Sequence, residues 1–502
     1  MTATDRPAAR VVRDRRIDVF AHPRNTLLLF LLLFIAVCVY METAVGYAEQ
    51  QFSGGSGERV IPNTHIPYVV AYGVWWLVVF GTEMSWRVVR NRGRRPLDLM
   101  RHPLAAQRID ELASEVGLKR RPRLFVVPRI GDQAFVGGST WMPVWRPYLV
   151  VGPGLLALGD RRDDTACQIF TAVVSHELAH LRNRDVMLLH LLAGLRCSNL
   201  VSALLFTYLL TLDTAGQGHT GLLFGALTLT LFALLIELII REMLRCRENY
   251  ADLRAARTRP QELELALRLA ERKRTHVAPR RLGRAVLTAW WKCHPSVRAR
   301  LRLLAEPGGL LRLPWLYVLL GGVLAGVSCV TVAASMSNRL HIDPSEKATF
   351  FFTNLLVGAP LGSFMAVGVW RQERHGSSSF ARSLADAAAR VMLLAIGFIV
   401  GCRLTPLTPY GRVYNDATLT LEPVLPWSLG ALLCGCVTLV GWPHLAARAL
   451  RLIRPQAGPA GWLFWWPLTL TAATAGFAVF YFLPLLEMTF PAVPAATQGL
   501  FP

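Results

Sequence analysis

The segment VSHELAHLRNRD, residues 174–185, contains a His-Glu-x-x-His motif made of His176, Glu177 and His180. On a helix, residues four apart lie one above the other on the same face, so both imidazoles can bind one ion. Zn²⁺ accepts imidazole and carboxylate ligands, and a catalytic zinc site keeps one position open for water. The motif therefore predicts His176 and His180 as zinc ligands and Glu177 as the general base that deprotonates the water.

A candidate third ligand lies about 70 residues further along, in the segment RENYAD, residues 247–252. Glu248 and Asp252 are one helical turn apart, so Glu248 can complete a two-histidine, one-glutamate set while Asp252 accepts the free N–H of a zinc-bound imidazole. The competing interpretation treats RENYAD as an ordinary charged helix end and the histidine motif as a solvated amphipathic helix. The position of both segments relative to the apolar stretches of the chain favours the metal site.

The composition indicates a membrane protein. The chain has 502 residues, 53% of them hydrophobic, and a mean hydropathy of +0.36. Nine stretches of about 20 mostly apolar residues are each long enough to cross a ~30 Å hydrocarbon layer as a helix. They lie at residues 26–46, 66–86, 188–211, 219–240, 315–335, 349–370, 384–402, 427–445 and 461–485.

The third and fourth stretches form a predicted hairpin, residues 188–240, joined by the short segment DTAGQGHTG. The histidine motif directly precedes its first arm, and RENYAD directly follows its second arm. Antiparallel arms of similar length bring these two ends together, so the two halves of the predicted zinc site meet on one side of the membrane.

The net charge of +21 follows the predicted topology. With a cytoplasmic N-terminus and nine alternating spans, the exterior loops contain five of the 54 basic residues: Arg59, Arg339, Lys347, Arg403 and Arg412. This distribution is the positive-inside pattern, and it predicts contact with anionic lipid head groups rather than nucleic acid. The nine cysteines lie in or near spans or in cytoplasmic segments, so no disulfide framework is expected.

These patterns divide the chain into four parts. A basic cytoplasmic N-terminus, residues 1–25, precedes two spans in residues 26–87, and the first apolar run after it is expected to be a retained signal anchor. Residues 88–310 contain the candidate site and the transmembrane hairpin, and residues 311–502 contain five further spans.

The segments HELAHLRNRD, ENYAD and HPSVRARL occur in the order seen in M48 metallopeptidases. Over roughly residues 66–310 the chain resembles the HtpX-like and Ste24-like membrane proteases. The resemblance implies a zincin-like α/β metallopeptidase domain on the cytoplasmic side and one zinc ion per chain. It also implies a role for His294 near the oxyanion, with Arg298 close by. The alternative for His294 is an ordinary residue before Pro295 at the start of a helix.

The segment DQAFVGG resembles the family's substrate-binding strand and places Ala134 and Phe135 in that role. Gln133 stands where the family commonly has Asn, so the sequence departs from the family's pattern at this position. An added β-strand of substrate would bind through main-chain hydrogen bonds and tolerate many sequences.

The overall prediction is a multi-spanning α-helical protein of the cell membrane with a zinc endopeptidase domain that faces the cytoplasm. Its expected partners are polypeptide substrates, chiefly membrane or membrane-proximal proteins, and the lipid bilayer. A membrane sensor-transducer with a metallopeptidase-like domain is the alternative, although its usual large extracytoplasmic domain has no counterpart among the exterior loops. A transporter or scaffold with a decayed site is the third reading, and the complete ligand set argues against it.

Overall fold

The computed structural model describes residues 26, 28–38, 94–138, 146–212, 219–275, 294–340, 354–375, 380–403 and 425–453. The chain divides into two compact units. Unit 1 consists of residues 1–19, 78–195 and 240–310, and unit 2 contains the remainder. The predicted catalytic residues all belong to unit 1.

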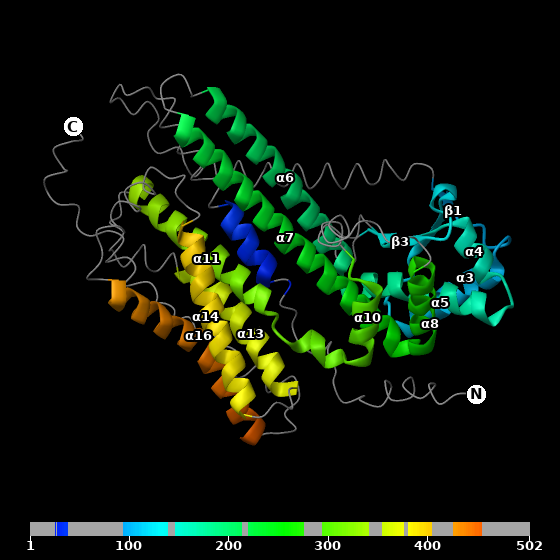
Figure 1. The fold of residues 1–502 in the computed structure, drawn as a ribbon. Helices are drawn as coiled ribbons and strands as arrows, with labels where there is room; N and C mark the ends of the chain where they lie inside the picture. Colours follow the sequence, from blue (N-terminus) through cyan, green and yellow to red (C-terminus); the bar gives the residue numbers. More distant parts are fainter. Residues whose placement is uncertain are drawn as a thin grey trace, which may run out of the picture. The chain divides into compact units, whose positions relative to one another are not determined.

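A small mixed sheet forms one layer of unit 1 (Figure 1). Its strands are β1 (Arg95–Pro96), β2 (Arg123–Val126), β3 (Ala134–Gly137) and β4 (Tyr148–Val151), in the spatial order β1-β2-β4-β3. Strands β2 and β4 are parallel, whereas β1 and β3 pair with their neighbours antiparallel. Strand β3 therefore lies at an edge of the described sheet.

Three helices pack on one face of this sheet: α3 (Pro103–Glu115), α4 (Pro153–Gly159) and α5 (Asp164–Asn183). Alternate residues of the strands face these helices, because successive side chains of a strand point to opposite sides. Leu149 and Val151 of β4 join Ile109, Leu155 and Phe170 in one buried hydrophobic core. This core supports α5, which carries the histidine motif.

Two long helices follow α5. They are α6 (Asp185–Leu212) and α7 (His219–Thr258), and the residues between them lie outside the described part of the chain. Helix α7 has 40 residues and carries Glu248 near its C-terminal end. Unit 1 is completed by α8 (Pro260–Thr275), which contacts α5, and by α10 (Val297–Ala305), which contacts α8.

Unit 2 contains a helical bundle of α11 (Trp315–Leu340), α13 (Ala359–His375), α14 (Phe380–Arg403) and α16 (Leu425–Ile453), with a π-helical turn η6 (Asn354–Gly358) before α13. Helices α11 and α14 approach so closely that a Cβ on Gly322 or Gly326 would overlap the backbone of α14. Gly397 and Gly401 of α14 are matched in the same way against α11. Glycines spaced four residues apart on both helices permit this backbone-to-backbone packing.

Two segments among the described residues are long and apolar enough to cross a membrane, Pro307–Cys329 and Ala381–Cys402. They correspond to the fifth and seventh predicted spans. The third, fourth and eighth predicted spans lie within helices α6, α7 and α16, and the described part of the sixth lies in η6 and α13. Within the described residues, no part of these helices meets the same length and composition test. Residues 27 and 39–46 of the first span and all of the second and ninth lie outside the described residues, so the nine-span topology stays a prediction.

The third predicted span contains a charged residue that the structure accounts for. Arg196 Nε of α6 lies 2.8 Å from Glu237 Oε2 of α7, so a cation and an anion from the two arms of the predicted hairpin form an ion pair. Ionisable groups inside a membrane are usually paired in this way.

Candidate metal centre and active site

Helix α5 holds His176, Glu177 and His180 within one and a half turns. The side chain of Asp163 caps its N-terminus and accepts hydrogen bonds from two backbone amides of the first turn, each 3.4 Å long. Such a cap satisfies N–H groups that have no partner inside the helix. The helix is thus fixed at its start by sequence-local chemistry and along its length by the hydrophobic core.

The end of α5 matters for the site as well. Arg184 adopts a left-handed backbone conformation, with φ 61° and ψ 29°, and α6 begins at the next residue. This sharp change of direction carries the carboxylate of Asp185 back toward the motif, where its Oδ2 lies 3.0 Å from His180 Nδ1.

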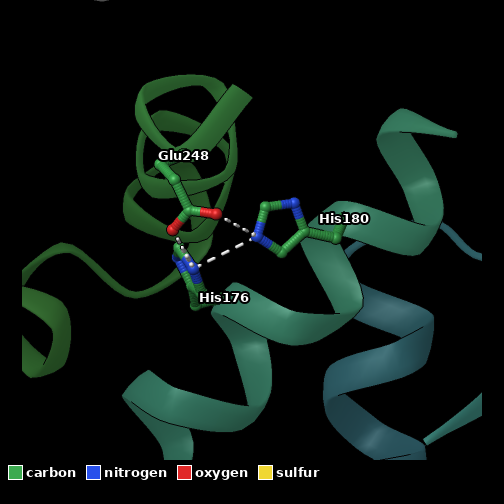
Figure 2. Close-up of side chains that lie close together, drawn as sticks. All are labelled: His176, His180 and Glu248. Carbon is green, nitrogen blue, oxygen red and sulfur yellow. Dashed lines mark hydrogen bonds and ion pairs between the residues drawn. The ribbon is translucent and has the colours of Figure 1, made fainter. Parts of the chain in front are cut away.

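Three candidate ligands converge from α5 and α7 (Figure 2). His176 Nε2 and His180 Nε2 are 3.3 Å apart. Glu248 places Oε2 at 3.4 Å from His176 Nε2 and Oε1 at 3.4 Å from His180 Nε2. The ring nitrogens and the carboxylate all point into one small space, and the three side chains are largely buried.

These separations fit a zinc ion. Ligand atoms at 2.0–2.1 Å from a tetrahedral metal are about 3.3–3.4 Å from one another, which matches the three separations on the site. Two imidazoles and one carboxylate are also a donor set that Zn²⁺ uses in catalytic centres, where a fourth position stays open. His176, His180 and Glu248 could therefore hold one such ion.

Each histidine has a carboxylate behind it. His176 Nδ1 lies 2.9 Å from Asp252 Oδ1, and His180 Nδ1 lies 3.0 Å from Asp185 Oδ2. A carboxylate at Nδ1 favours the tautomer that carries its proton there and leaves the Nε2 lone pair for a metal. Asp252 is at the position that the sequence predicts, whereas Asp185 performs the equivalent task for the second histidine.

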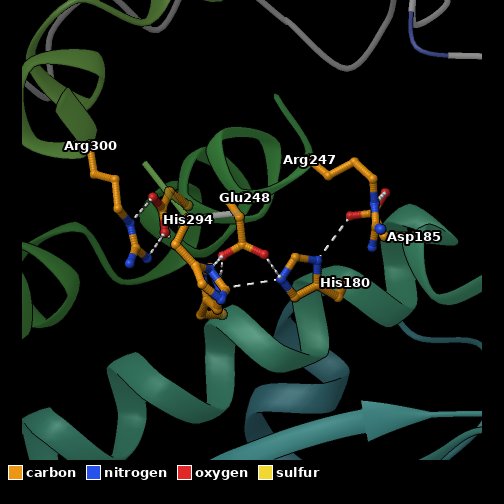
Figure 3. A network of polar contacts seen from close by, with 8 residues as sticks. His180, Asp185, Arg247, Glu248, His294 and Arg300 are labelled. Carbon is orange, nitrogen blue, oxygen red and sulfur yellow. Dashed lines mark hydrogen bonds and ion pairs between the residues drawn. The ribbon is translucent and has the colours of Figure 1, made fainter. Parts of the chain in front are cut away.

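The arginine beside the site is Arg300 rather than Arg298 (Figure 3). Arg300 contacts both carboxylate oxygens of Asp252, with Nε 2.5 Å from Oδ2. Arg298 instead donates to Glu271 at 2.8 Å and is 72% exposed. Both residues lie in the first turn of α10, whose orientation turns position 300 toward the site and position 298 toward α8 and solvent.

His294 lies at the open side of the ligand cluster. Its Nδ1 is 2.9 Å from Glu248 Oε2, and 72% of its side chain is exposed. This residue precedes α10, which Ser296 caps by accepting a hydrogen bond from the backbone of Ala299. His294 is therefore held next to a candidate ligand while remaining accessible from outside.

The pKa values of the clustered side chains reflect the lone pairs that converge between them. Burial disfavours the charged form of His176, but Asp252 and Glu248 outweigh this effect and raise its pKa from 6.5 to about 10. Burial also disfavours charge on Glu248, yet its contacts with His176, His180 and His294 hold its pKa well below the usual range. A positive charge between these groups is strongly favoured.

Glu177 has the opposite shift. Burial raises the pKa of its carboxyl group above the usual value, and the nearby His180 and His176 oppose part of that increase. A carboxylate with a raised pKa is a better proton acceptor at neutral pH than a solvated one. This property fits the role of general base that the sequence predicts for Glu177.

The predicted substrate strand is β3, which contacts α5. The Gly152 amide donates to the Gln133 carbonyl at 2.9 Å, and Phe135 lies opposite Val150 in the same register. Hydrogen-bonded pairs alternate in an antiparallel ladder, so the backbone groups of Phe135 face β4. Those of Ala134 face away from β4, toward the edge.

Three residues around the site were not predicted from sequence: Asp185 as a partner of a ligand, Arg247 and Arg300. For Asp185, its place five residues after His180 is the available signal. Arg247 Nε lies 3.4 Å from Asp185 Oδ1. Nothing in the spacing of the basic residues distinguishes Arg247 or Arg300 from their neighbours.

Comparisons with known proteins find one family and three named relatives for part of the chain. Residues 101–307 match the family model described as peptidase family M48. A protein named "Protease HtpX homolog" from Acidiphilium cryptum is 29% identical over 180 residues, which are 36% of this chain and 59% of that protein. A second with this name, from Thermoplasma acidophilum, is 27% identical over 194 residues, or 38% of this chain and 55% of that protein.

A third relative of the same name, from Halobacterium salinarum, is 24% identical over 215 residues, or 43% of this chain and 67% of that protein. No solved structure matches the chain. The chain thus spans a little more than half the length of the first two relatives, and the matched family segment ends before the C-terminal helices of unit 2. Residues 101–307 therefore correspond to a peptidase domain of family M48, and this part of the chain is similar to the proteins named protease HtpX homolog.

Proposed function

We propose that this protein is a membrane-embedded, zinc-dependent endopeptidase that hydrolyses peptide bonds of membrane or membrane-proximal polypeptides. The observation that supports it most directly is the set of 3.3–3.4 Å separations among His176 Nε2, His180 Nε2 and the Glu248 carboxylate. These atoms come from two helices, with Glu248 lying 68 positions after His180 in the sequence, and their convergence suits one tetrahedral cation.

A zinc ion held by these residues would polarise the scissile carbonyl and make a water molecule acidic enough to react near neutral pH. Glu177 then accepts a proton from the attacking water and transfers it to the leaving amine. Its buried position, which raises the pKa of its carboxyl group, supports both steps.

His294 is proposed to stabilise the developing oxyanion. It stands beside Glu248 at the exposed side of the cluster, where a substrate carbonyl can approach. A hydrogen-bond donor in this position strengthens an interaction that exists chiefly in the transition state. The contact with Glu248 also holds the ring in place before substrate arrives.

Substrate is proposed to bind as an added strand along the edge of β3. The outward-facing backbone groups belong to Ala134 and Val136, because the register assigns those of Phe135 to β4. Main-chain pairing would provide affinity with little dependence on sequence, as expected for an enzyme that cleaves many polypeptides.

The site is proposed to face the cytoplasm, with the chain anchored in the cell membrane by several helices. Two described segments suit a membrane span, and the basic residues concentrate in the predicted cytoplasmic loops. That distribution also supports contact with anionic lipid head groups.

The test is a comparison of the full-length protein with its Glu177→Gln variant in detergent. The variant should contain as much zinc as the wild type and lose cleavage of a fluorescently labelled unfolded protein by on the order of 1,000-fold or more. Glu264→Gln serves as a matched control, because Glu264 lies on α8 and pairs with Arg268 outside the ligand cluster. Cleavage by the Glu177→Gln protein at the wild-type rate would refute the mechanism.

A comparison of membrane proteomes from cells that express wild type or Glu177→Gln addresses the substrates. Membrane or membrane-proximal proteins should accumulate intact in the variant cells. Accumulation of soluble cytosolic proteins alone would contradict the proposed substrate class.

A further inference from the structure

Behind the candidate ligands lie two rows of buried polar side chains, here called the first and the second chain. Each contains one histidine, one aspartate and one arginine. One runs from His176 through Asp252 to Arg300. The other runs from His180 through Asp185 to Arg247 (Figure 3). Each chain places a carboxylate on the Nδ1 side of a histidine and an arginine on that carboxylate. The second chain contains two residues that the proposed function does not use.

Asp185 is the centre of the second chain. One of its oxygens, Oδ2, lies 3.0 Å from His180 Nδ1, and the other, Oδ1, lies 3.4 Å from Arg247 Nε. Asp185 is 1% exposed and Arg247 is 5% exposed. A carboxylate this deeply buried needs partners to stay charged, and here a cation stands on the side opposite the histidine.

The position of Arg247 in the amino-acid sequence gives its contact with Asp185 a second consequence. Arg247 directly precedes Glu248 on α7, while Asp185 directly follows the turn that ends α5. The pair therefore links the helix that supplies the glutamate ligand to the end of the helix that supplies both histidines. The first chain makes the reciprocal link, because Asp252 of α7 reaches back to His176 of α5.

We propose that Arg247 is a positioning residue of the metal centre. Through Asp185 it orients His180 with Nε2 toward the ion, and it sets the separation of α5 and α7 at which Glu248 completes the ligand set. This inference rests on the proposed function, since it concerns the same metal site. Residues that orient a metal ligand typically change metal affinity 10–100-fold when replaced.

The experiment compares zinc affinities of full-length proteins in detergent by competition with a chromophoric chelator. The decisive variant is Asp185→Asn/Arg247→Met, which removes both buried charges together and leaves neither of them unpaired. Its zinc affinity should fall about 10–100-fold. The visible absorption spectrum of the Co²⁺-substituted protein should also shift, because it reports ligand geometry directly.

The matched control is Glu115→Gln/Arg259→Met, which removes an ion pair with contacts of 2.6 and 3.0 Å that also joins two parts of unit 1. This pair does not touch the ligands, so its loss should leave zinc affinity and the Co²⁺ spectrum unchanged. An equal loss of affinity in both double variants would indicate general destabilisation and overturn the proposal.

A more conservative variant covers the case in which the decisive one does not fold. Arg247→Lys keeps the cation and removes the planar guanidinium, so its zinc affinity should fall several-fold with a smaller Co²⁺ shift. If the variant that folds has the same zinc affinity and the same Co²⁺ spectrum as the wild type, the positioning role is overturned. A wild-type protein that binds no zinc would instead overturn the proposed function, so the two failures are distinguishable.

Discussion

Unit 1 and unit 2 each contain a buried cluster of histidine, carboxylate and arginine side chains. In unit 1 it is the metal centre already described. In unit 2 it is a C-terminal polar cluster made of Glu373, Ser383, His444 and Arg448, which come from α13, α14 and α16. The residue types are similar, but the arrangement of donors and acceptors differs.

In the C-terminal polar cluster, donors face acceptors. Ser383 donates to Glu373 Oε1 at 2.7 Å, and Arg448 Nε lies 3.3 Å from the other carboxylate oxygen. His444 places Nε2 at 3.2 Å from Ser383 Oγ and Nδ1 at 3.3 Å from Glu373 Oε1. A cluster of this kind is already neutralised and stabilises the contact between three helices.

In the metal centre, acceptors face one another. With the imidazole protons on the Nδ1 atoms, His176 and His180 direct two Nε2 lone pairs at each other and at the carboxylate of Glu248. This arrangement is repulsive until a proton or a metal cation lies between them. The comparison teaches that the convergence of lone pairs, rather than the presence of histidine and glutamate, indicates a metal site.

The largest expected effect distinguishes the histidines of the two clusters. His180→Ala should reduce bound zinc to near zero and reduce peptide cleavage by on the order of 1,000-fold. His444→Ala should keep zinc content and cleavage at the wild-type level while lowering stability by about 1–3 kcal/mol. Metal analysis and a cleavage assay on both purified variants check this pair, and zinc loss in His444→Ala would break the comparison.

The pH dependence of zinc binding tests the comparison of the two clusters further. In the metal-free protein a proton on His176, whose pKa is raised to about 10, takes the place of the cation, and zinc must displace it. Zinc binding should therefore tighten as pH rises from 6 to 8, by about tenfold per pH unit for each proton displaced. Competition titrations at several pH values measure this slope.

The stability of the metal-free protein should fall as pH rises, whereas zinc affinity increases. Because the pKa of His176 is about 10 in the folded state and 6.5 ordinarily, its protonation stabilises the fold fully below pH 6.5. That stabilisation should be lost as pH rises toward 10. Thermal unfolding of metal-free wild type and His176→Ala across this range should converge at high pH. Parallel curves would contradict the assignment.

A smaller effect tests whether the two units are stabilised separately. Gly326→Ala should lower the stability of the α11–α14 packing by about 1–3 kcal/mol, because the added methyl group overlaps the Phe398 carbonyl. Zinc affinity should not change. Gly441→Ala is the control, since its added Cβ would make only an ordinary contact with Val437. A weakened metal site in Gly326→Ala would show that the units are coupled.

The smallest expected effect concerns Arg298. Arg298→Gln should alter stability by no more than about 0.5 kcal/mol and leave zinc affinity unchanged, because its ion pair with Glu271 is exposed. Arg300→Gln should weaken zinc binding about 10–100-fold, because it removes the buried partner of Asp252. Equal effects in binding titrations would mean that the two arginines are not distinguished by burial.

The local features of the site could be predicted from sequence because helical periodicity fixes them. Residues 176 and 180 share a face in any α-helix, and so do residues 248 and 252. The apolar stretches in residues 188–211 and 219–240 likewise predicted helices, and α6 and α7 cover these ranges. The identity of the arginine beside Asp252 could not be predicted, since it depends on how α10 is rotated against the site.

The sequence by itself determined the two half-sites, the helices that carry them and the uneven distribution of basic charge, because each depends on spacing or composition within a short segment. Only the tertiary structure decided that Asp185 serves His180, that Arg300 rather than Arg298 serves Asp252, and that Ala134 rather than Phe135 turns its backbone to the edge of β3. These outcomes depend on the relative rotation and register of packed elements. Such variables are fixed by contacts between residues far apart in the chain, and spacing along the chain does not contain them.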